Sequence, residues 1–213
     1  MKCDKKTMLL YAVTDRAWVG KETLYQQVED ALKGGITCLQ LREKELPAEA
    51  FYEEAVQIQK LCHQYGVPFL IDDNVEVALR CGADGVHVGQ QDMAAQEVRR
   101  RVGERMILGV SAGTVEEAVC AEQAGADYLG VGAVFSTATK EDAAPVSRQT
   151  LIAICQTVHI PVVAIGGIKE NNLMQLAGTG VDGVSIVSAV FGSPDITAAC
   201  RKLKALSAKM VSG

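Results

Sequence analysis

The chain has 213 residues, of which 48% are hydrophobic and 22% charged, with a formal net charge of −5. This balance is typical of a globular protein and excludes a disordered or fibrous chain. Lys and Arg are scattered rather than clustered and only 5% of residues are aromatic, so neither nucleic acid nor an anionic membrane is expected as a partner.

The apolar runs, the N-terminus and the cysteines predict the cellular compartment of the protein. The longest apolar runs, such as Met8–Val13 and Ile160–Ile165, are far shorter than the ~20 residues that span a bilayer. The basic N-terminus is followed by no apolar signal region or small-residue cleavage site. The seven cysteines include no CxxC pair and no histidine at zinc-ligand spacing. We expect a cytoplasmic protein with reduced cysteines.

An internal repeat organises the chain. Each copy has a glycine, a small or aliphatic residue, then Asp or Thr before an apolar run. The copies are Gly34–Leu39, Cys81–Val86, Ala124–Leu129 and Thr179–Val184. This pattern predicts a helix ending on a glycine, a short polar loop and a strand. The spacing is about twice one β/α unit, so half of the strands are predicted to be entered through the same turn.

The other predicted strands are continuous apolar runs between these copies. They are Met8–Val13, Val67–Ile71, Met106–Val110 and Pro161–Ile165. Such runs suit strands that are covered on both faces.

Segments with helical periodicity separate the strands. Residues 47–65 start with Pro47 at the first helical position and place an apolar stripe from Phe51 to Tyr65 on one face. Thr114 and Glu117 suggest a capping box, and Asp195 is predicted to cap the last helix. No linker divides the chain, so residues 1–213 are predicted to form one domain.

Eight strands alternating with eight helices leave two α/β architectures, an open doubly wound sheet and a closed barrel. The candidate functional residues follow strands two to eight. An open sheet would spread those strand ends over more than ~30 Å, at ~4.8 Å per strand. A single-domain (β/α)8 TIM barrel brings them to one face and is therefore the predicted fold.

The second strand ends with polar side chains on one face. Gln40, Arg42 and Lys44 alternate with Leu41 and Glu43, which are predicted to point toward the helices. Two cations and an amide suit a polyanion such as a pyrophosphate. The alternative is a solvated strand end whose cations pair with nearby acids.

Carboxylates follow the next two strands. Asp73 and Asp92 are the predicted pair for a Mg²⁺ ion shared between protein and phosphate oxygens. The alternative is helix capping by Asn74 and Asp92. His87, inside a strand, is interpreted as a core histidine bonded to a backbone carbonyl rather than as a catalytic base.

Two later loops complete the candidate site. Thr137, Thr139 and Lys140 can bind carboxylate or phosphate oxygens, or can form a polar surface loop. In barrels, the loops after strands seven and eight usually bind phosphate, and Gly166, Gly167 and the segment Val187–Ser188 occupy these positions. Together the residues suggest a diphosphate ester joined to a phosphorylated second substrate.

Short motifs along almost the entire chain resemble those of thiamin-phosphate synthases. They are Leu10–Asp15, Gln40–Lys44, Ile71–Val75, His87–Asp92, Gly109–Ala112, Thr137–Lys140, Gly166–Ile168 and Gly183–Ser188. Each is weak alone, but their order is specific.

The resemblance implies that an aminopyrimidine methyl diphosphate is coupled to a thiazole ethyl phosphate, with Mg²⁺ as cofactor and pyrophosphate as leaving group. It implies that the pyrimidine diphosphate is held by Gln40, Arg42, Lys44, Asp72, Ser111 and Lys140. Asp73 and Asp92 would ligate Mg²⁺. The thiazole phosphate would be held by Thr137, Thr139, Gly167, Val187 and Ser188.

Two positions depart from the family pattern. Asp72 stands where Asn is usual, which places a carboxylate against the diphosphate, and Gly113 stands where His is common. The alternatives are a thiazole tautomerase-type isomerase, which needs no diphosphate site, and a non-catalytic phosphate-binding barrel. The partners are expected to be small molecules, and a homo-oligomer is left open.

Overall fold

The computed structural model describes residues 3–20, 22–137 and 145–213. Within these ranges eight parallel strands pair in chain order and close into a barrel, with β1 bonded to both β2 and β8. The strands are β1 (Leu10–Val13), β2 (Cys38–Leu41), β3 (Phe69–Asp72), β4 (Gly85–Val88), β5 (Ile107–Ala112), β6 (Tyr128–Val131), β7 (Val162–Ile165) and β8 (Gly183–Ile186). The predicted barrel is confirmed.

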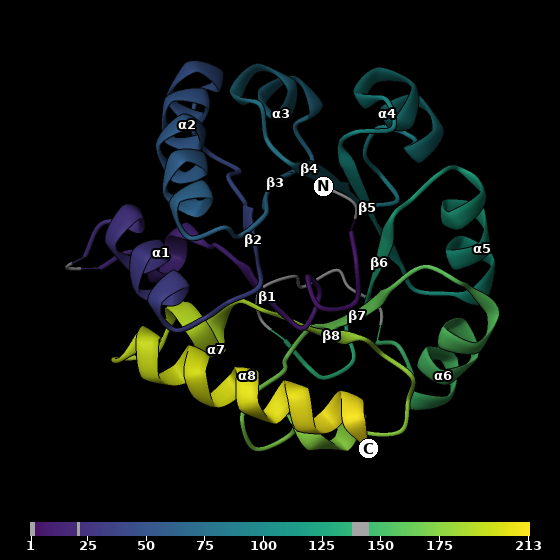
Figure 1. Ribbon diagram of the computed structural model, residues 1–213. Helices are drawn as coiled ribbons and strands as arrows, with labels where there is room; N and C mark the ends of the chain where they lie inside the picture. The colour runs from purple at the N-terminus through teal and green to yellow at the C-terminus, as the bar shows by residue number, and fades with distance from the viewer. Residues whose placement is uncertain (1–2, 21, 138–144) are drawn as a thin grey trace.

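A ring of helices surrounds the strands (Figure 1). The α-helices are α1 (Leu24–Lys33), α2 (Ala48–Gln64), α3 (Val75–Cys81), α4 (Ala95–Val102), α5 (Val115–Gln123), α6 (Arg148–Thr157), α7 (Ser188–Phe191) and α8 (Ile196–Ser212). Two 3₁₀ segments, η1 (Arg16–Trp18) and η2 (Leu173–Leu176), lie in the connections. Only η2 joins β7 to β8, so the expectation of an α-helix after every strand is wrong there.

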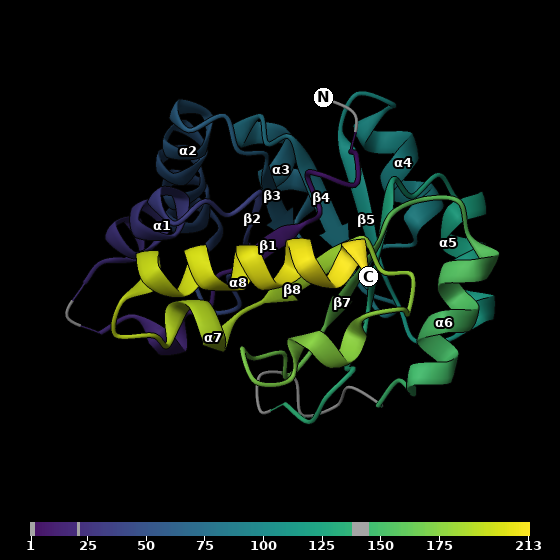
Figure 2. The same ribbon diagram turned by 60° about the horizontal axis from the view of Figure 1, so that its bottom comes forward.

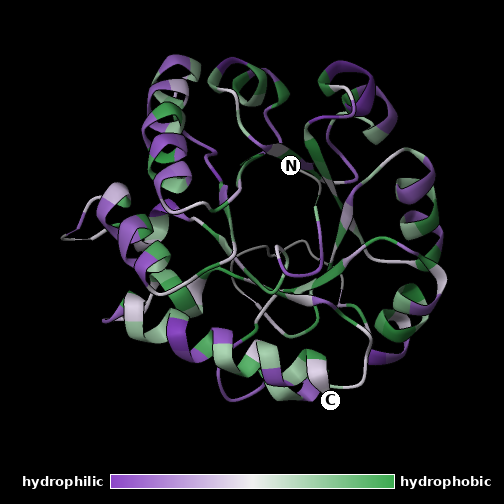
Figure 3. Ribbon diagram, in the orientation of Figure 1, coloured by the Kyte–Doolittle hydropathy of each residue, from purple (hydrophilic) through white to green (hydrophobic). Residues whose placement is uncertain are grey.

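Strand side chains alternate between two cores, as the period of two requires. Tyr11 and Val13 belong to an inner cluster with Leu70 and Tyr128, whereas Leu10 and Ala12 pack with the helices. Figure 3 shows hydrophobic residues along the strands and on helix faces turned toward them.

The internal repeat builds one hydrogen-bonded clasp four times at the amino ends of the strands. Asp84, just before β4, accepts from Phe69 N at 2.9 Å and donates its own N–H to Phe69 O at 2.9 Å. The same two bonds join three further pairs: Thr37 with Leu10, Asp127 with Leu108, and Asp182 with Val162. Each even-numbered strand is thus tied to the start of the strand before it.

A glycine precedes each clasp in the left-handed region. For example, Gly125 has φ +90° and Gly180 has φ +92°. A residue with a Cβ would be strained there, which explains why the repeat contains glycine. The predicted turn is confirmed, although the last copy follows η2 rather than an α-helix.

The helix ends differ in detail from the sequence predictions. Pro47 is the N-cap of α2 rather than its first residue, and Tyr65 lies beyond the helix with 40% of its surface exposed. Thr114 accepts from Glu117 N, but the Glu117 carboxylate accepts from Gly113 N instead of the cap residue. Asp195 caps α8 through Ala198 N, as predicted.

Candidate active site at the carboxyl ends of the strands

The predicted site residues within the described ranges lie at the carboxyl ends of their strands or in the loops that follow. Gln40 and Ser111 are within β2 and β5, Asp72 ends β3, and Ser188 opens α7 after β8. In Figure 2 this end of the barrel, marked by α7, lies opposite the N-terminus. Thr139 and Lys140 lie outside the described residues, and their predicted roles stay predictions.

Cations and carboxylates meet at the ends of β2 and β3. The Asp72 carboxylate lies 3.7 Å from Arg42 Nε and 3.6 Å from Lys44 Nζ. Arg42 Nη1 is also 3.6 Å from Asp15, and Lys44 hydrogen-bonds Asp73. The two cations therefore pair with nearby carboxylates, as the alternative interpretation predicts. Polyanion binding by these cations stays a prediction.

The environment of Lys44 keeps its ammonium charged. Burial alone would lower the pKa of Lys44, but the bond to Asp73 and the charges of Asp72 and Asp73 outweigh it and raise the pKa. A permanently charged amine is suited to binding an anion and unsuited to acting as a base.

A partly buried ion cluster that the sequence analysis missed supports the end of β2. The Glu43 side chain is 2% exposed and points away from Arg42, as the alternation predicts. It accepts two hydrogen bonds from Arg16 of η1, at 2.7 Å from Nη2 and 3.0 Å from Nε, and Arg16 Nη2 also donates to Glu54 of α2 at 2.7 Å. The cluster joins three elements behind the cationic face. Its members are charged residues 11 and 27 positions apart, for which sequence spacing gives no signal.

Asp73 has a backbone conformation that its neighbours do not share. Its φ is +58°, the one left-handed non-glycine value among the described residues. Asp73 N donates to His87 O at 2.8 Å, which ties this turn to β4. Strained conformations of this kind concentrate at binding and catalytic sites, and here the turn directs the carboxylate toward Lys44 and Asp92.

Asp92 faces Asp73, and its Oδ2 accepts from Gly89 N at 2.8 Å. Burial and then the neighbouring Asp73 carboxylate raise the pKa of Asp92. The two carboxylates repel one another, and a bound dication would relieve that repulsion. Mg²⁺ fits such a pair, because it usually takes one or two carboxylates and completes its coordination shell with water and phosphate oxygens. Among the described residues no group of three or more His, Cys, Asp or Glu side chains could hold a metal.

His87 does not have the environment that the sequence analysis predicted. Its Nδ1 lies 2.8 Å from Tyr128 Oη and its Nε2 lies 2.9 Å from Ser111 Oγ, so among the described residues side chains, and not the predicted backbone carbonyl, bond both ring nitrogens. The prediction was wrong because alternation turns His87 into the barrel, where polar side chains from β5 and β6 meet it. A cavity of about 30 Å³ lies among these groups and Ser185.

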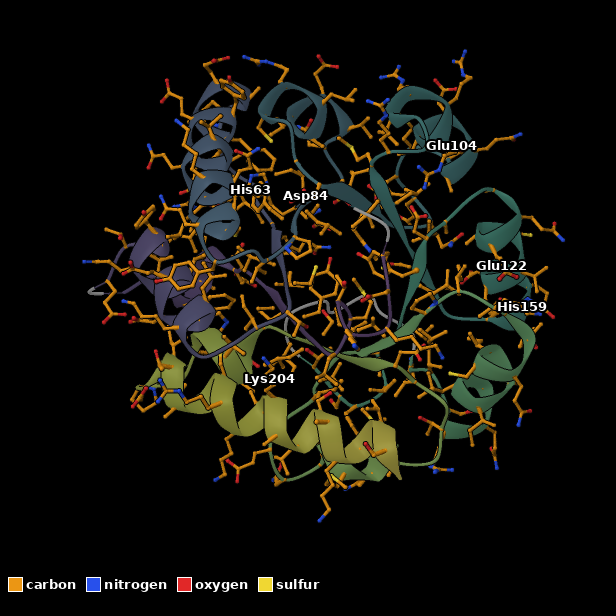
Figure 4. The ribbon with its side chains drawn as sticks, in the orientation of Figure 1. His63, Asp84, Glu104, Glu122, His159 and Lys204 are labelled. Carbon is orange, nitrogen blue, oxygen red and sulfur yellow. The ribbon has the colours of Figure 1, made fainter. Side chains whose placement is uncertain are left out.

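The other two histidines serve elsewhere, as Figure 4 shows. His63 Nε2 is 2.9 Å from Asp84, a member of the clasp at the amino ends of the strands. His159 lies beside Glu122, with its backbone N donating to that carboxylate at 2.7 Å. Neither belongs to the candidate site.

Glycines shape the loop after β7. Gly166 and Gly167 have φ +100° and +64°, and a Cβ at Gly167 would stand 2.3 Å from Ser136 O of the loop after β6. The glycines are thus required by backbone conformation and by packing of the two loops.

The loops after β7 and β8 lie side by side. Ile165 of β7 pairs with Ser185 of β8, and Gly167 and Val187 come two residues after Ile165 and Ser185, respectively. The N–H of Ser188 lies at the start of α7, where helix N–H groups lack intrahelical acceptors. This arrangement is compatible with the phosphate-binding role that the sequence analysis expects for the two loops, and that role stays a prediction.

The fold and this site define a (β/α)8-barrel enzyme whose mouth combines cations, a carboxylate pair and a pair of backbone loops suited to phosphate. The family model described as thiamine monophosphate synthase matches residues 10–190. The chain therefore belongs to the thiamine monophosphate synthase family, and it is a transferase of thiamine biosynthesis.

Individual relatives agree with this assignment. The chain is 49% identical to a thiamine-phosphate synthase of Ruminiclostridium cellulolyticum over 91% of this chain and 92% of the relative. It is 46% identical to one from Clostridium tetani, over 91% and 93%. A solved thiamine phosphate pyrophosphorylase from Pyrococcus furiosus superposes with a TM-score of 0.90 at 38% identity, covering 97% and 98% of the two chains.

In the described ranges no helix combines the length and apolar character needed to cross a membrane. The seven cysteines are free, and four of them are buried.

Proposed function

We propose that the chain joins 4-amino-2-methyl-5-(diphosphooxymethyl)pyrimidine to a thiazole ethyl phosphate, giving thiamin phosphate and pyrophosphate with Mg²⁺ as cofactor. The observation that carries this proposal is convergence. Arg42, Lys44, Asp73 and Asp92 follow three consecutive strands, β2, β3 and β4, and their contacts with one another and with Asp72 form one cluster.

The diphosphate is held by the cations at the end of β2. Arg42 and Lys44 contact its oxygens, and Gln40, Asp72, Ser111 and Lys140 complete the group. Asp72 lies between both cations in the structure, so the incoming diphosphate competes with this carboxylate for them. Asp73 and Asp92 would hold Mg²⁺, which supplies charge neutralisation for the leaving pyrophosphate.

The reaction we propose is dissociative. The bond between the methylene carbon and the diphosphate oxygen breaks, and its electron pair leaves with pyrophosphate. The ring amino group stabilises the resulting carbocation, and the thiazole nitrogen then donates its lone pair to that carbon. No proton is removed, which agrees with a mouth that offers charged cations rather than a base. The protein positions both substrates and stabilises the charge on the leaving group.

The second substrate occupies the opposite side of the mouth. Thr137, Thr139 and the backbone at Gly167, Val187 and Ser188 bind the thiazole phosphate. The start of a helix and left-handed glycines offer N–H groups to an anion without a charged side chain.

The test is pyrophosphate release from the purified chain with both substrates and Mg²⁺, together with detection of thiamin phosphate. We expect product only when both substrates and Mg²⁺ are present. Isomerisation of a thiazole phosphate without the pyrimidine would instead indicate a tautomerase. Phosphate binding by folded protein without turnover of either substrate would indicate a non-catalytic barrel. Either result would contradict the proposal.

A further inference from the structure

Five polar side chains form a continuous hydrogen-bonded chain through the barrel interior. Gln40 Nε2 donates to Tyr11 Oη at 2.8 Å, and Tyr11 Oη lies 2.8 Å from Tyr128 Oη. Tyr128 Oη lies 2.8 Å from His87 Nδ1, and His87 Nε2 lies 2.9 Å from Ser111 Oγ. The chain starts and ends on two residues to which we assign the diphosphate, and it crosses the barrel beneath them.

This chain is built into the fold rather than resting on its surface. Gln40, Tyr11 and Tyr128 are 5%, 2% and 0% exposed. The ring of Tyr128 fits because residue 109 of β5 has no side chain, since a Cβ there would stand 2.2 Å from Tyr128 Cζ. Tyr11 and Tyr128 pack edge to face, with ring centroids 5.8 Å apart.

The chemistry of the members fixes the direction of every bond. An amide Nε2 is only a donor, and a tyrosine hydroxyl has one hydrogen to give. Tyr11 accepts from Gln40 and gives its hydrogen to Tyr128, because the reverse direction would leave the buried Tyr11 hydrogen with no acceptor among the five side chains. Tyr128 in turn gives its hydrogen to His87 Nδ1. An accepting Nδ1 requires the imidazole proton to be on Nε2, which then donates to Ser111 Oγ.

Every other proton arrangement leaves one buried hydrogen without an acceptor among the five side chains. A doubly protonated His87 would place donors at both ends and leave one tyrosine hydrogen with no acceptor among the five side chains. Burial raises the pKa of both tyrosines well above the ordinary value, so the two hydroxyls keep their hydrogens. Since consecutive hydrogen bonds polarise one another, the aligned chain is also the stronger one.

We propose that Tyr11 and Tyr128 hold His87 in its Nε2–H form, and that His87 in turn commits the Ser111 hydroxyl to donate toward the barrel mouth. Tyr11, Tyr128 and His87 are thus positioning residues. Because Ser111 Oγ accepts from His87, its own hydrogen is directed to the substrate side. A hydroxyl in this state suits a phosphate oxygen, which only accepts. That last step rests on the proposed function, whereas the proton arrangement does not.

The experiment is a long-range ¹⁵N–¹H correlation spectrum of the full chain with ¹⁵N-labelled histidine, recorded without ligands. His63→Gln and His159→Gln assign the three histidines by elimination. We expect the pattern of an Nε2-protonated neutral ring for His87. A proton on Nδ1, or on both nitrogens, would overturn the proposal.

Two conservative variants test the row of hydrogen bonds from Gln40 to Ser111. Tyr128→Phe keeps the ring but removes the donor to Nδ1, so the His87 Nδ1 resonance should move downfield, toward that of an unbonded ring nitrogen. Tyr11→Phe, one bond further away, should cause a smaller shift in the same direction. Tyr25→Phe, which removes an exposed hydroxyl on α1, is the matched control and should leave His87 unchanged. An unshifted Nδ1 in Tyr128→Phe would show that this tyrosine does not set the proton.

A titration with magnesium pyrophosphate separates this inference from the proposed function. We expect Tyr128→Phe to bind about threefold more weakly than wild type, the effect of weakening one hydrogen bond. If Tyr128→Phe binds magnesium pyrophosphate as tightly as wild type, the hydrogen-bonded side chains do not direct the Ser111 hydroxyl, and this part of the proposal is overturned. Wild type that binds no magnesium pyrophosphate but shows the Nε2–H ring would contradict the proposed function and leave the proton arrangement standing.

Discussion

The two ends of the barrel are built on different principles. At the amino ends of the strands one clasp is repeated four times, each with a side-chain oxygen that accepts from the preceding strand. At the carboxyl ends of β2, β3 and β4 the groups differ from strand to strand, and Asp73 adopts a left-handed backbone. The first end satisfies its own hydrogen bonds, whereas the second holds carboxylates beside one another and cations that a ligand can reach.

This difference separates stability from activity within one fold. In barrels the catalytic groups occupy the carboxyl ends, and the opposite face serves stability. Changes at the clasps should therefore unfold the protein without altering the chemistry, and changes at the mouth should do the reverse. Substitutions at four positions test and sharpen this separation, in order of expected effect.

Arg42→Ala should cause the largest loss, because it removes a cation that stabilises the leaving diphosphate. We expect a cost of roughly 2–4 kcal/mol in transition-state stabilisation, with little change in the free energy of unfolding. The measurement is kcat/KM for pyrophosphate release together with urea unfolding. A kcat/KM within about threefold of wild type would contradict the assigned role.

Asp84→Ala should destabilise the protein and spare its chemistry, since it leaves the buried N–H of Phe69 without its acceptor. Such a group costs about 1–3 kcal/mol. Asp84→Asn is the matched control, because its amide oxygen can still accept that bond. Urea unfolding should rank wild type above Asp84→Asn and both above Asp84→Ala. An unchanged midpoint for Asp84→Ala would remove the stabilising role of the clasp.

Two substitutions at Asp73 separate charge from backbone conformation. Asp73→Asn tolerates the left-handed φ but loses the carboxylate, so the Mg²⁺ concentration for half-maximal activity should rise more than about tenfold. Asp73→Ala should in addition lower the free energy of unfolding by about 1 kcal/mol, because alanine is less stable than Asn or Asp in the left-handed backbone conformation. Equal stability of the two variants would show that the backbone at Asp73 carries no strain.

The substitution Asp92→Asn should have the smallest effect, which is a change in how stability depends on pH. Its pKa in the folded protein is raised above the ordinary value of 3.8, so between the two values the folded state binds more protons. Stability without Mg²⁺ should then fall as the pH rises from 3.8 through the raised pKa. Asp92→Asn should lose this component, seen as a flatter unfolding profile relative to wild type. Identical slopes for the two proteins would contradict the shift.

Much of the fold follows from local pattern. Buried parallel strands are continuous apolar runs, and the repeated glycine before Asp or Thr marks the entry to β2, β4, β6 and β8. The helix ends were less certain, because Pro47 and Tyr65 lie near a boundary where several backbone states have similar energy. The segment between β7 and β8 lacks an α-helix, a difference that depends on packing rather than on periodicity.

The site was predictable to the extent that strand alternation and strand ends define it. Arg42, Lys44, Asp73 and Asp92 follow from position alone once the barrel is assumed. The partners of His87 did not follow, because Tyr128 and Ser111 lie on other strands, 41 and 24 positions away in the sequence. Arg16 was missed for the same reason, since only folding brings it to Glu43 and Glu54.

The amino-acid sequence by itself determined which residues form strands, which turns require glycine and which charged groups end each strand, because these depend on interactions between near neighbours. Tertiary structure alone decided how Asp72 lies between two cations, how Asp92 meets Asp73 and how five side chains align across the interior. Those arrangements depend on strand register and barrel closure, which set distances between residues that the chain does not otherwise connect.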